Sequence, residues 1–212
     1  MEENKVDSNY LLTELEDQYD YISYLVGAMQ FTAEKDGGQE KREDFVRELL
    51  LRGVFPINPV TLEKLKTGMS IKEATEKISG WIASGQREKL RECGRNVWKG
   101  KEGITEEGNI VHVAGDLDYT KMSNWITFIL NKGDQPCGSY MEVGVAIDHD
   151  IPVYLITEIP KKDLKQSLIL AVEAAYGEFF ENPSQYFKFI DEKYHLKRKE
   201  SNLKEEPKED KK

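Results

Sequence analysis

Continuous apolar runs, separated by turns that contain Gly or Pro, dominate the middle of the chain. Four of these runs have the length and the β-branched and aromatic content of buried strands, and they lie at 21–26, 54–57, 125–130 and 151–156. Runs that are apolar throughout, without alternation, are typical of parallel strands that helices cover on both faces. The pattern therefore predicts an α/β fold with a doubly wound parallel sheet.

Apolar residues at helical spacing fill the segments between and after these strands. One amphipathic helix is expected over 40–52, with Arg52 on its apolar face. A longer helix is expected over 161–180, and Pro183 begins another. The apolar faces of these C-terminal helices offer a packing surface for a second subunit.

Residues 61–109 differ from the segments on either side of them. Their apolar residues are spaced for helices, and Lys, Glu, Gly and Arg separate them. We interpret the segment as a helical insertion or lid between the second and third strands, which ends in a flexible polar link over 100–109. Trp81 and Trp98 could pack on a nucleobase, although apolar filling is the more common role of such residues.

The stretch from Asp134 to Ile147 follows the third strand and precedes the fourth. A Pro/Gly turn leads into small residues, which predicts a helix with Ser139 as its cap. Gly138 has no side chain, so it would let a ligand or another backbone approach the start of this helix closely. Glu142 lies one turn into this helix, at the positive end of its dipole, where a carboxylate suits nucleophilic attack on a sugar carbon. The spacing of Ser139 and Glu142 is also that of a capping box, which is the more common role on spacing alone.

Two further strand ends lie beside this stretch in the predicted sheet, and ligands of open α/β sheets bind beyond such ends. The first strand ends at Gly27 and opens into a loop with Asp36, which is either an active-site wall or an ordinary surface loop. Arg42 could face that loop, although its position alone is more typical of a solvated arginine. Asp116 lies near the same edge, where it either caps a short helix over 117–122 or ends a short strand.

The charge balance narrows the range of partners. The 212-residue chain has a formal net charge of −9, which argues against a nucleic-acid polymer or an anionic membrane but not against a small phosphorylated ligand. Cys93 and Cys137 have no metal or redox spacing, and the three histidines do not cluster, so we expect neither a metal nor a cofactor. No apolar run approaches the roughly 20 residues of a membrane helix and no signal peptide is in view, so a cytoplasmic location is expected.

The composition predicts a single α/β domain between two polar segments. The domain is expected over 20–196 and includes the insertion. Residues 1–19 are expected to form a flexible leader, and residues 197–212, rich in Lys and Glu, a disordered tail.

Three separated motifs carry a family resemblance. They read Tyr-Leu-Val-Gly-Ala-Met-Gln-Phe over 24–31, Asp-Leu-Asp-Tyr-Thr-Lys-Met-Ser-Asn over 116–124, and Gly-Ser-Tyr-Met-Glu-Val-Gly-Val-Ala over 138–146. Their order and spacing resemble the nucleoside 2-deoxyribosyltransferase superfamily, which includes the 2′-deoxynucleoside 5′-phosphate N-hydrolases. The resemblance covers roughly residues 21–157 and leaves the insertion unmatched. It implies a flavodoxin-like sheet and cleavage of the N-glycosidic bond of a (deoxy)nucleoside or nucleoside 5′-monophosphate, by hydrolysis or base exchange.

The resemblance also implies roles for individual residues. Glu142 would be the nucleophile on the anomeric carbon, and Asp116 would bind the sugar or assist proton transfer. Tyr24 would line the sugar pocket, next to the strand end at Gly27. The glycine–serine pair at 138–139, with the amides of the helix start, would suit a 5′-hydroxyl or a 5′-phosphate.

One departure from the family concerns the leaving base. The transferases carry an aspartate six residues before the glutamate, where this chain has Pro136. The proton donor therefore stays open between Asp116, Asp118 and Asp134. An alternative function is a non-catalytic protein of the same fold that senses a nucleotide or nucleotide sugar. Relatives complete the pocket from a neighbouring subunit, so the resemblance also implies a homo-oligomer.

Overall fold

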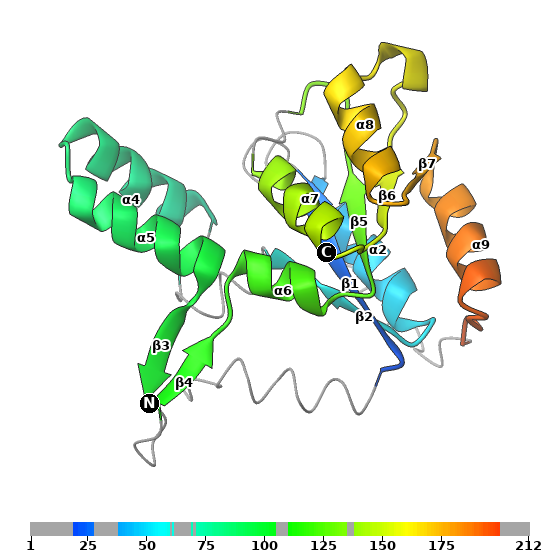
Figure 1. The fold of residues 1–212 in the computed structure, drawn as a ribbon, viewed down its shortest axis with the longest axis horizontal. Coiled ribbons are helices and arrows are strands. Elements are labelled where there is room, and N and C mark those ends of the chain that lie inside the picture. The colour runs from blue at the N-terminus through cyan, green and yellow to red at the C-terminus, as the bar shows by residue number, and fades with distance from the viewer. Residues whose placement is uncertain are drawn as a thin grey trace, which may run out of the picture.

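A computed structural model describes residues 19–27, 38–59, 61, 69, 71–104, 110–134 and 138–199. Within these residues, five strands form one parallel sheet in the order β2-β1-β5-β6-β7 (Figure 1). The strands are β1 (Tyr21–Gly27), β2 (Val54–Ile57), β5 (Trp125–Ile129), β6 (Val153–Ile156) and β7 (Glu178–Phe180). The four predicted strands coincide with β1, β2, β5 and β6, and the predicted parallel sheet is confirmed.

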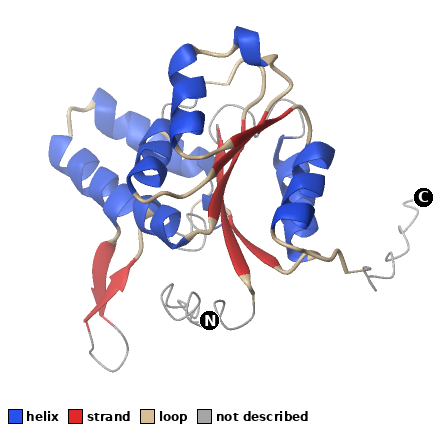
Figure 2. Ribbon diagram, turned by 45° about the vertical axis from the view of Figure 1, so that its right-hand side comes forward, coloured by secondary structure: helices blue, strands red, loops and turns tan. Residues whose placement is uncertain are grey.

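Helices cover both faces of the sheet (Figure 2). The helices on one face are α6 (Asp116–Met122), α7 (Ser139–Asp148) and α8 (Gln166–Ala174), and those on the other are α2 (Gly38–Leu50) and α9 (Pro183–Lys193). A short 3-10 helix, η1 (Lys161–Asp163), precedes α8. Neighbouring residues of β1 divide between the two cores, since Tyr24 enters the core under α7 and Leu25 the core under α2. This is the doubly wound, flavodoxin-like arrangement.

The helix predicted over 161–180 is wrong at both ends, because α8 occupies only its middle and its last residues form β7. Tyr176 has a left-handed backbone with a φ of 49°. Gly177 lies so close to the carbonyl of Val153 that any Cβ would collide with it. The chain therefore leaves the helix at this point and pairs with β6 as a fifth strand, which the sequence pattern does not indicate.

The insertion contains two helices, α4 (Ile71–Ala83) and α5 (Arg87–Lys99), which confirm its predicted helical character. The flexible polar link predicted over 100–109 is wrong in its first part, because β3 (Lys101–Ile104) pairs antiparallel with β4 (Ile110–Val113). These two strands form a ribbon of their own. Figure 1 shows this ribbon and the two helices projecting from the central sheet.

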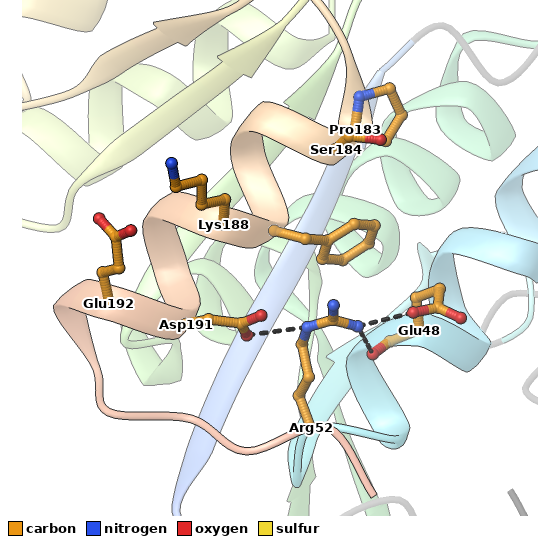
Figure 3. Close-up of a pocket in the computed structure, with 8 residues that line it drawn as sticks. Glu48, Arg52, Pro183, Ser184, Lys188, Asp191 and Glu192 are labelled. Atoms are coloured by element: carbon orange, nitrogen blue, oxygen red, sulfur yellow. Dashed lines mark hydrogen bonds and ion pairs between the residues drawn. The ribbon is translucent and has the colours of Figure 1, made fainter. Parts of the chain in front are cut away.

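Arg52 lies in the turn after α2 and joins that helix to α9. Its guanidinium is 2.8 Å from the Asp191 carboxylate and 2.7 Å from the Glu48 carboxylate, and it lies 4.4 Å from the centre of the Phe187 ring (Figure 3). The side chain is buried as the spacing predicts, but it is buried as part of an ion-pair network.

The ends of the chain are described only in part. Residues 1–18 and 200–212 lie outside the described residues, so the leader and most of the tail stay predictions. The first residues of the predicted tail contact α2, because Arg198 lies 2.9 Å from Glu48 and the amide of Lys199 donates to the Leu51 carbonyl at 2.8 Å. No helix in the described ranges has the length and apolarity that a membrane crossing requires.

Candidate active site

The predicted site lies where the sheet changes its winding direction. Strands β1 and β5 are neighbours, but the chain leaves β1 for α2 on one face and leaves β5 for α7 on the other. Ligands of open α/β sheets bind at such a switch point, beyond the carboxyl ends of the strands. Gly27 ends β1 with a φ of 155°, and a Cβ there would lie 2.5 Å from the Ile129 carbonyl oxygen. Only glycine lets the two strand ends approach this closely.

Glu142 reaches from the first turn of α7 to the middle of β1. Its side chain is buried, with 5% of the residue exposed, and its Oε1 accepts a hydrogen bond of 2.7 Å from the hydroxyl of Tyr24, which is fully buried. The predicted cap at Ser139 is wrong, because Ser139 lies inside the helix and Gly138 before it already has helical backbone angles. The glutamate side chain therefore bonds to a strand residue, and a capping box does not account for its position.

Burial dominates the electrostatics of this pair. It raises the pKa of Glu142 from its ordinary value of 4.5 to about 7, although the Tyr24 hydrogen bond and the charge of Arg42 both favour the ionised form. Burial also raises the pKa of Tyr24, and the negative charges of Glu142 and Asp116 raise it further. Tyr24 is therefore a fixed hydrogen-bond donor, while Glu142 titrates near neutral pH.

Arg42 brings a positive charge to the site. It lies on α2, partly buried, and its Nη2 is 3.4 Å from the Leu25 carbonyl oxygen in β1. Burial lowers its pKa, and electrostatic interactions with Tyr24, Glu142 and Asp134 oppose that effect. The solvated surface arginine considered from its position alone is therefore wrong. The side chain reaches the carboxyl end of β1 and provides a positive charge close to Glu142.

Asp116 and Asp134 border the same cluster. Asp116 is the first residue of α6, only 3% exposed, and its charge acts on Tyr24. The short helix expected here is present as α6, but the predicted cap at Asp116 is wrong, because α6 begins at Asp116 and Gly115 is its N-cap. Asp134 closes the turn after β5, where its carboxylate accepts a hydrogen bond of 2.8 Å from the Asn131 amide. Both aspartates therefore lie near the switch point.

Asp118 is engaged elsewhere. Its carboxylate accepts a hydrogen bond of 3.0 Å from the Gly115 amide and lies 2.8 Å from His112 Nε2 on β4. Burial raises the pKa of Asp118, but the bonds from His112 and Gly115 outweigh it and leave the pKa below its usual range. The carboxylate thus holds the start of α6 against the ribbon. Asp36 and Pro136 lie outside the described residues, so the prediction for Asp36 stays a prediction.

Trp98 lies beside the site, a position that the sequence does not indicate. It lies near the end of α5, and its indole atom Cη2 would be 3.3 Å from a Cβ on Gly138. The insertion therefore reaches the start of α7, one turn from Glu142. Gly100 and Gly115 let the two backbones approach, but their places in the sequence do not indicate this contact.

One hollow of the described surface lies away from this cluster. It has a volume of about 680 Å³ and lies between α2 and α9, lined by Arg52, Phe187 and Asp191 among others (Figure 3). It includes none of the predicted site residues. Within the described ranges, no group of three or more His, Cys, Asp or Glu side chains is placed to hold a metal ion. The chain matches no protein-family model and no curated protein.

Proposed function

We propose that this protein cleaves the N-glycosidic bond of a (deoxy)nucleoside or nucleoside 5′-monophosphate, by hydrolysis or base exchange. The observation that carries the proposal is the buried carboxylate of Glu142, held 2.7 Å from the Tyr24 hydroxyl at the switch point of the sheet. A buried carboxylate with a perturbed pKa at such a position is typical of a functional group. The resemblance of the three motifs to nucleoside 2-deoxyribosyltransferases supplies the reaction class.

In the proposed reaction, an oxygen of the Glu142 carboxylate attacks the anomeric carbon while the bond from that carbon to the base breaks. The electron pair of the broken bond leaves with the base, which takes a proton from a neighbouring acid. Water or a second base then attacks the same carbon, gives a proton back to the group that protonated the leaving base, and frees the carboxylate. Tyr24 holds Oε1 and so fixes the orientation of the nucleophile.

Asp116 is our preferred partner of Glu142. It is buried, and its charge acts on Tyr24, which contacts Glu142 directly. Asp118 is less suited to proton transfer, because its carboxylate already bonds to His112 and Gly115. The proposal therefore gives Asp116 the role of binding the sugar or passing a proton to the leaving base.

The test is the release of free base from a panel of deoxynucleosides and their 5′-monophosphates. The wild-type protein should release base from at least one member of the panel, and Glu142→Gln should lower that rate by roughly a thousandfold or more, because the nucleophile is lost. Glu88→Gln is the matched control, since Glu88 lies in the first turn of α5 and is exposed. Its rate should equal that of the wild type.

Two results would overturn the proposal. Full activity of Glu142→Gln would remove the residue from the reaction. Absence of base release from every substrate, together with a rise in the melting temperature on addition of a nucleotide, would instead favour a sensor that binds nucleotides without turnover.

A further inference from the structure

Two glycines hold the end of the insertion against the start of α6. A Cβ on Gly115 would collide with the amide nitrogen of Gly100 and would lie 2.7 Å from the main-chain carbon and oxygen of Trp98. Gly100 has a φ of 72°, which glycine adopts without strain, and it lies against the Val113 carbonyl. The backbone of Trp98 is therefore fixed next to Gly115, the residue before Asp116.

The side chain of Trp98 extends from this point to the start of α7. The atoms that approach Gly138 are Cη2, at 3.3 Å from the position of a Cβ, and Cζ2, at 3.8 Å. Both belong to the far edge of the six-membered ring, so the edge of the indole contacts the helix start. Trp98 thus spans the two helix starts that carry Asp116 and Glu142.

The ring of Trp98 differs from the other two indoles in its surroundings. Trp125 is fully buried and stacks on Tyr194, with 4.4 Å between the ring centres. Trp81 has the ammonium group of Lys77 5.5 Å from its ring centre. Among the described residues, no aromatic ring or cation packs on Trp98, which is only partly buried. Its backbone lies against Gly115, and one edge of its ring lies against Gly138.

We infer that Trp98 is the residue on which the nucleobase of the substrate stacks, a role that rests on the proposed function. The helix start at Gly138 suits the sugar or phosphate end of a nucleotide, and an indole fixed beside it suits the flat base. Stacking on an aromatic ring is tolerant of base identity, because every base has a π-face. The insertion therefore supplies the base-binding wall of the site.

The test compares a ligand that has a base with one that lacks it. Binding of 2′-deoxycytidine 5′-monophosphate, 2′-deoxyguanosine 5′-monophosphate and 2-deoxyribose 5-phosphate is measured by calorimetry in the Glu142→Gln background, where no turnover interferes. Adding Trp98→Leu should weaken binding of both nucleotides between about fivefold and a hundredfold. Binding of the sugar phosphate should stay unchanged, because it makes no contact with the indole.

Two further variants make the comparison specific. Trp98→Phe keeps an aromatic face and should retain most of the nucleotide affinity. Trp81→Leu removes an indole from the same insertion. Trp81 lies in the last turn of α4, and the start of α5 that follows it is roughly 16 Å along that helix from Trp98. This variant should therefore change neither affinity. The melting temperatures of all variants show whether each one is folded.

The outcomes separate this inference from the proposed function. Equal weakening of nucleotide and sugar phosphate, or no weakening at all, would overturn the role of Trp98 while base release by the wild type still supported the function. A folded Trp98→Phe variant that loses as much affinity as Trp98→Leu would overturn the stacking role as well. If the wild type neither releases base nor binds any of the three probes, the proposed function fails, and the inference fails with it.

Discussion

The two faces of β1 bury polar groups in different ways. Under α9, Ser23 Oγ lies 2.8 Å from Thr127 Oγ1, Thr127 Oγ1 lies 2.7 Å from the Tyr186 hydroxyl, and Trp125 Nε1 donates to that hydroxyl at 2.9 Å. All of these groups are neutral, and each has a partner. On the face under α7, Tyr24 donates to the carboxylate of Glu142, a group that carries a charge when ionised.

This difference separates a structural network from the site of the proposed function. Neutral buried groups that satisfy one another need no change of protonation and stabilise the fold. A buried carboxylate is different, because its ionisation is opposed by roughly 3 kcal/mol when its pKa moves from 4.5 to about 7. A buried carboxylate at a sheet switch point therefore lowers the stability of the protein. Groups with such a perturbed pKa are typical of functional sites.

The largest effect on stability is expected from Glu142→Gln. The folded-state pKa of Glu142, about 7, is above its ordinary value of 4.5, so the folded protein keeps a proton that the unfolded chain releases. Wild-type stability should therefore fall as the pH rises from about 4.5 to about 7, and stay lower above it. The variant should lack this loss and should exceed the wild type by up to about 3 kcal/mol at pH 8, but not at pH 4.

Urea unfolding of both proteins at pH 4, 6 and 8 measures this difference. The exposed Glu88→Gln control should follow the wild-type curve at each pH. A Glu142→Gln variant that is less stable than the wild type at pH 8 would show that the carboxylate holds the fold together, and the contrast between the two faces would be lost.

The next effect is expected from Tyr186→Phe, on the neutral face. Removal of the hydroxyl leaves the buried Trp125 Nε1 without its acceptor, and Thr127 keeps only its bond to Ser23. The variant should lose about 1–3 kcal/mol of unfolding free energy at every pH and keep the wild-type rate of base release. Tyr176→Phe removes an exposed hydroxyl and is the matched control. A loss of activity without a loss of stability would place this network in the reaction.

The smallest effect is expected from Arg42→Met. The charge of Arg42 favours the ionised form of Glu142, so its removal should raise the pKa of Glu142 further. In the wild type, kcat/KM for base release should rise with pH through about 7, as the carboxylate ionises. The wild-type rate at pH 6 should be about tenfold below its plateau, and the variant should reach its plateau at higher pH, with a rate at pH 6 lower than that of the wild type by up to about a further tenfold.

Arg47→Met is the control for this prediction, because Arg47 lies on the same helix but is exposed and pairs with Asp44. Its pH profile should match the wild type. An unchanged profile for Arg42→Met would mean that its charge does not reach the carboxylate.

Much of the fold could be predicted because buried parallel strands are continuous apolar runs. Val54–Ile57 and Trp125–Ile129 are such runs, and both are strands. Glu178–Phe180 is not distinguishable in this way, since its three residues continue the helical spacing before it. Lys101–Ile104 contains a charged pair and a glycine, so its pairing with 110–113 leaves no apolar signature.

The site could be predicted only where topology determines it. Tyr24 and Glu142 come together because β1 and β5 are adjacent and α7 follows β5, an order that the strand pattern indicates. The burial of Arg42 depends on how α2 packs on the sheet, and helical spacing does not determine this packing. The approach of Trp98 to Gly138 joins residues far apart in the chain, and it depends on glycine contacts whose effect is visible only in three dimensions.

The most direct measurement is a search for the covalent intermediate on Glu142. The protein is incubated with 2′-fluoro analogues of the nucleoside 5′-monophosphates from which it releases base, because the electron-withdrawing fluorine slows the breakdown of a glycosyl–enzyme ester. Peptides are then analysed by mass spectrometry. We expect one sugar phosphate per chain, attached to the peptide that contains Glu142 and absent from the Glu142→Gln variant. Base release without an adduct, or an adduct on another carboxylate, would contradict the assignment of Glu142 as the nucleophile.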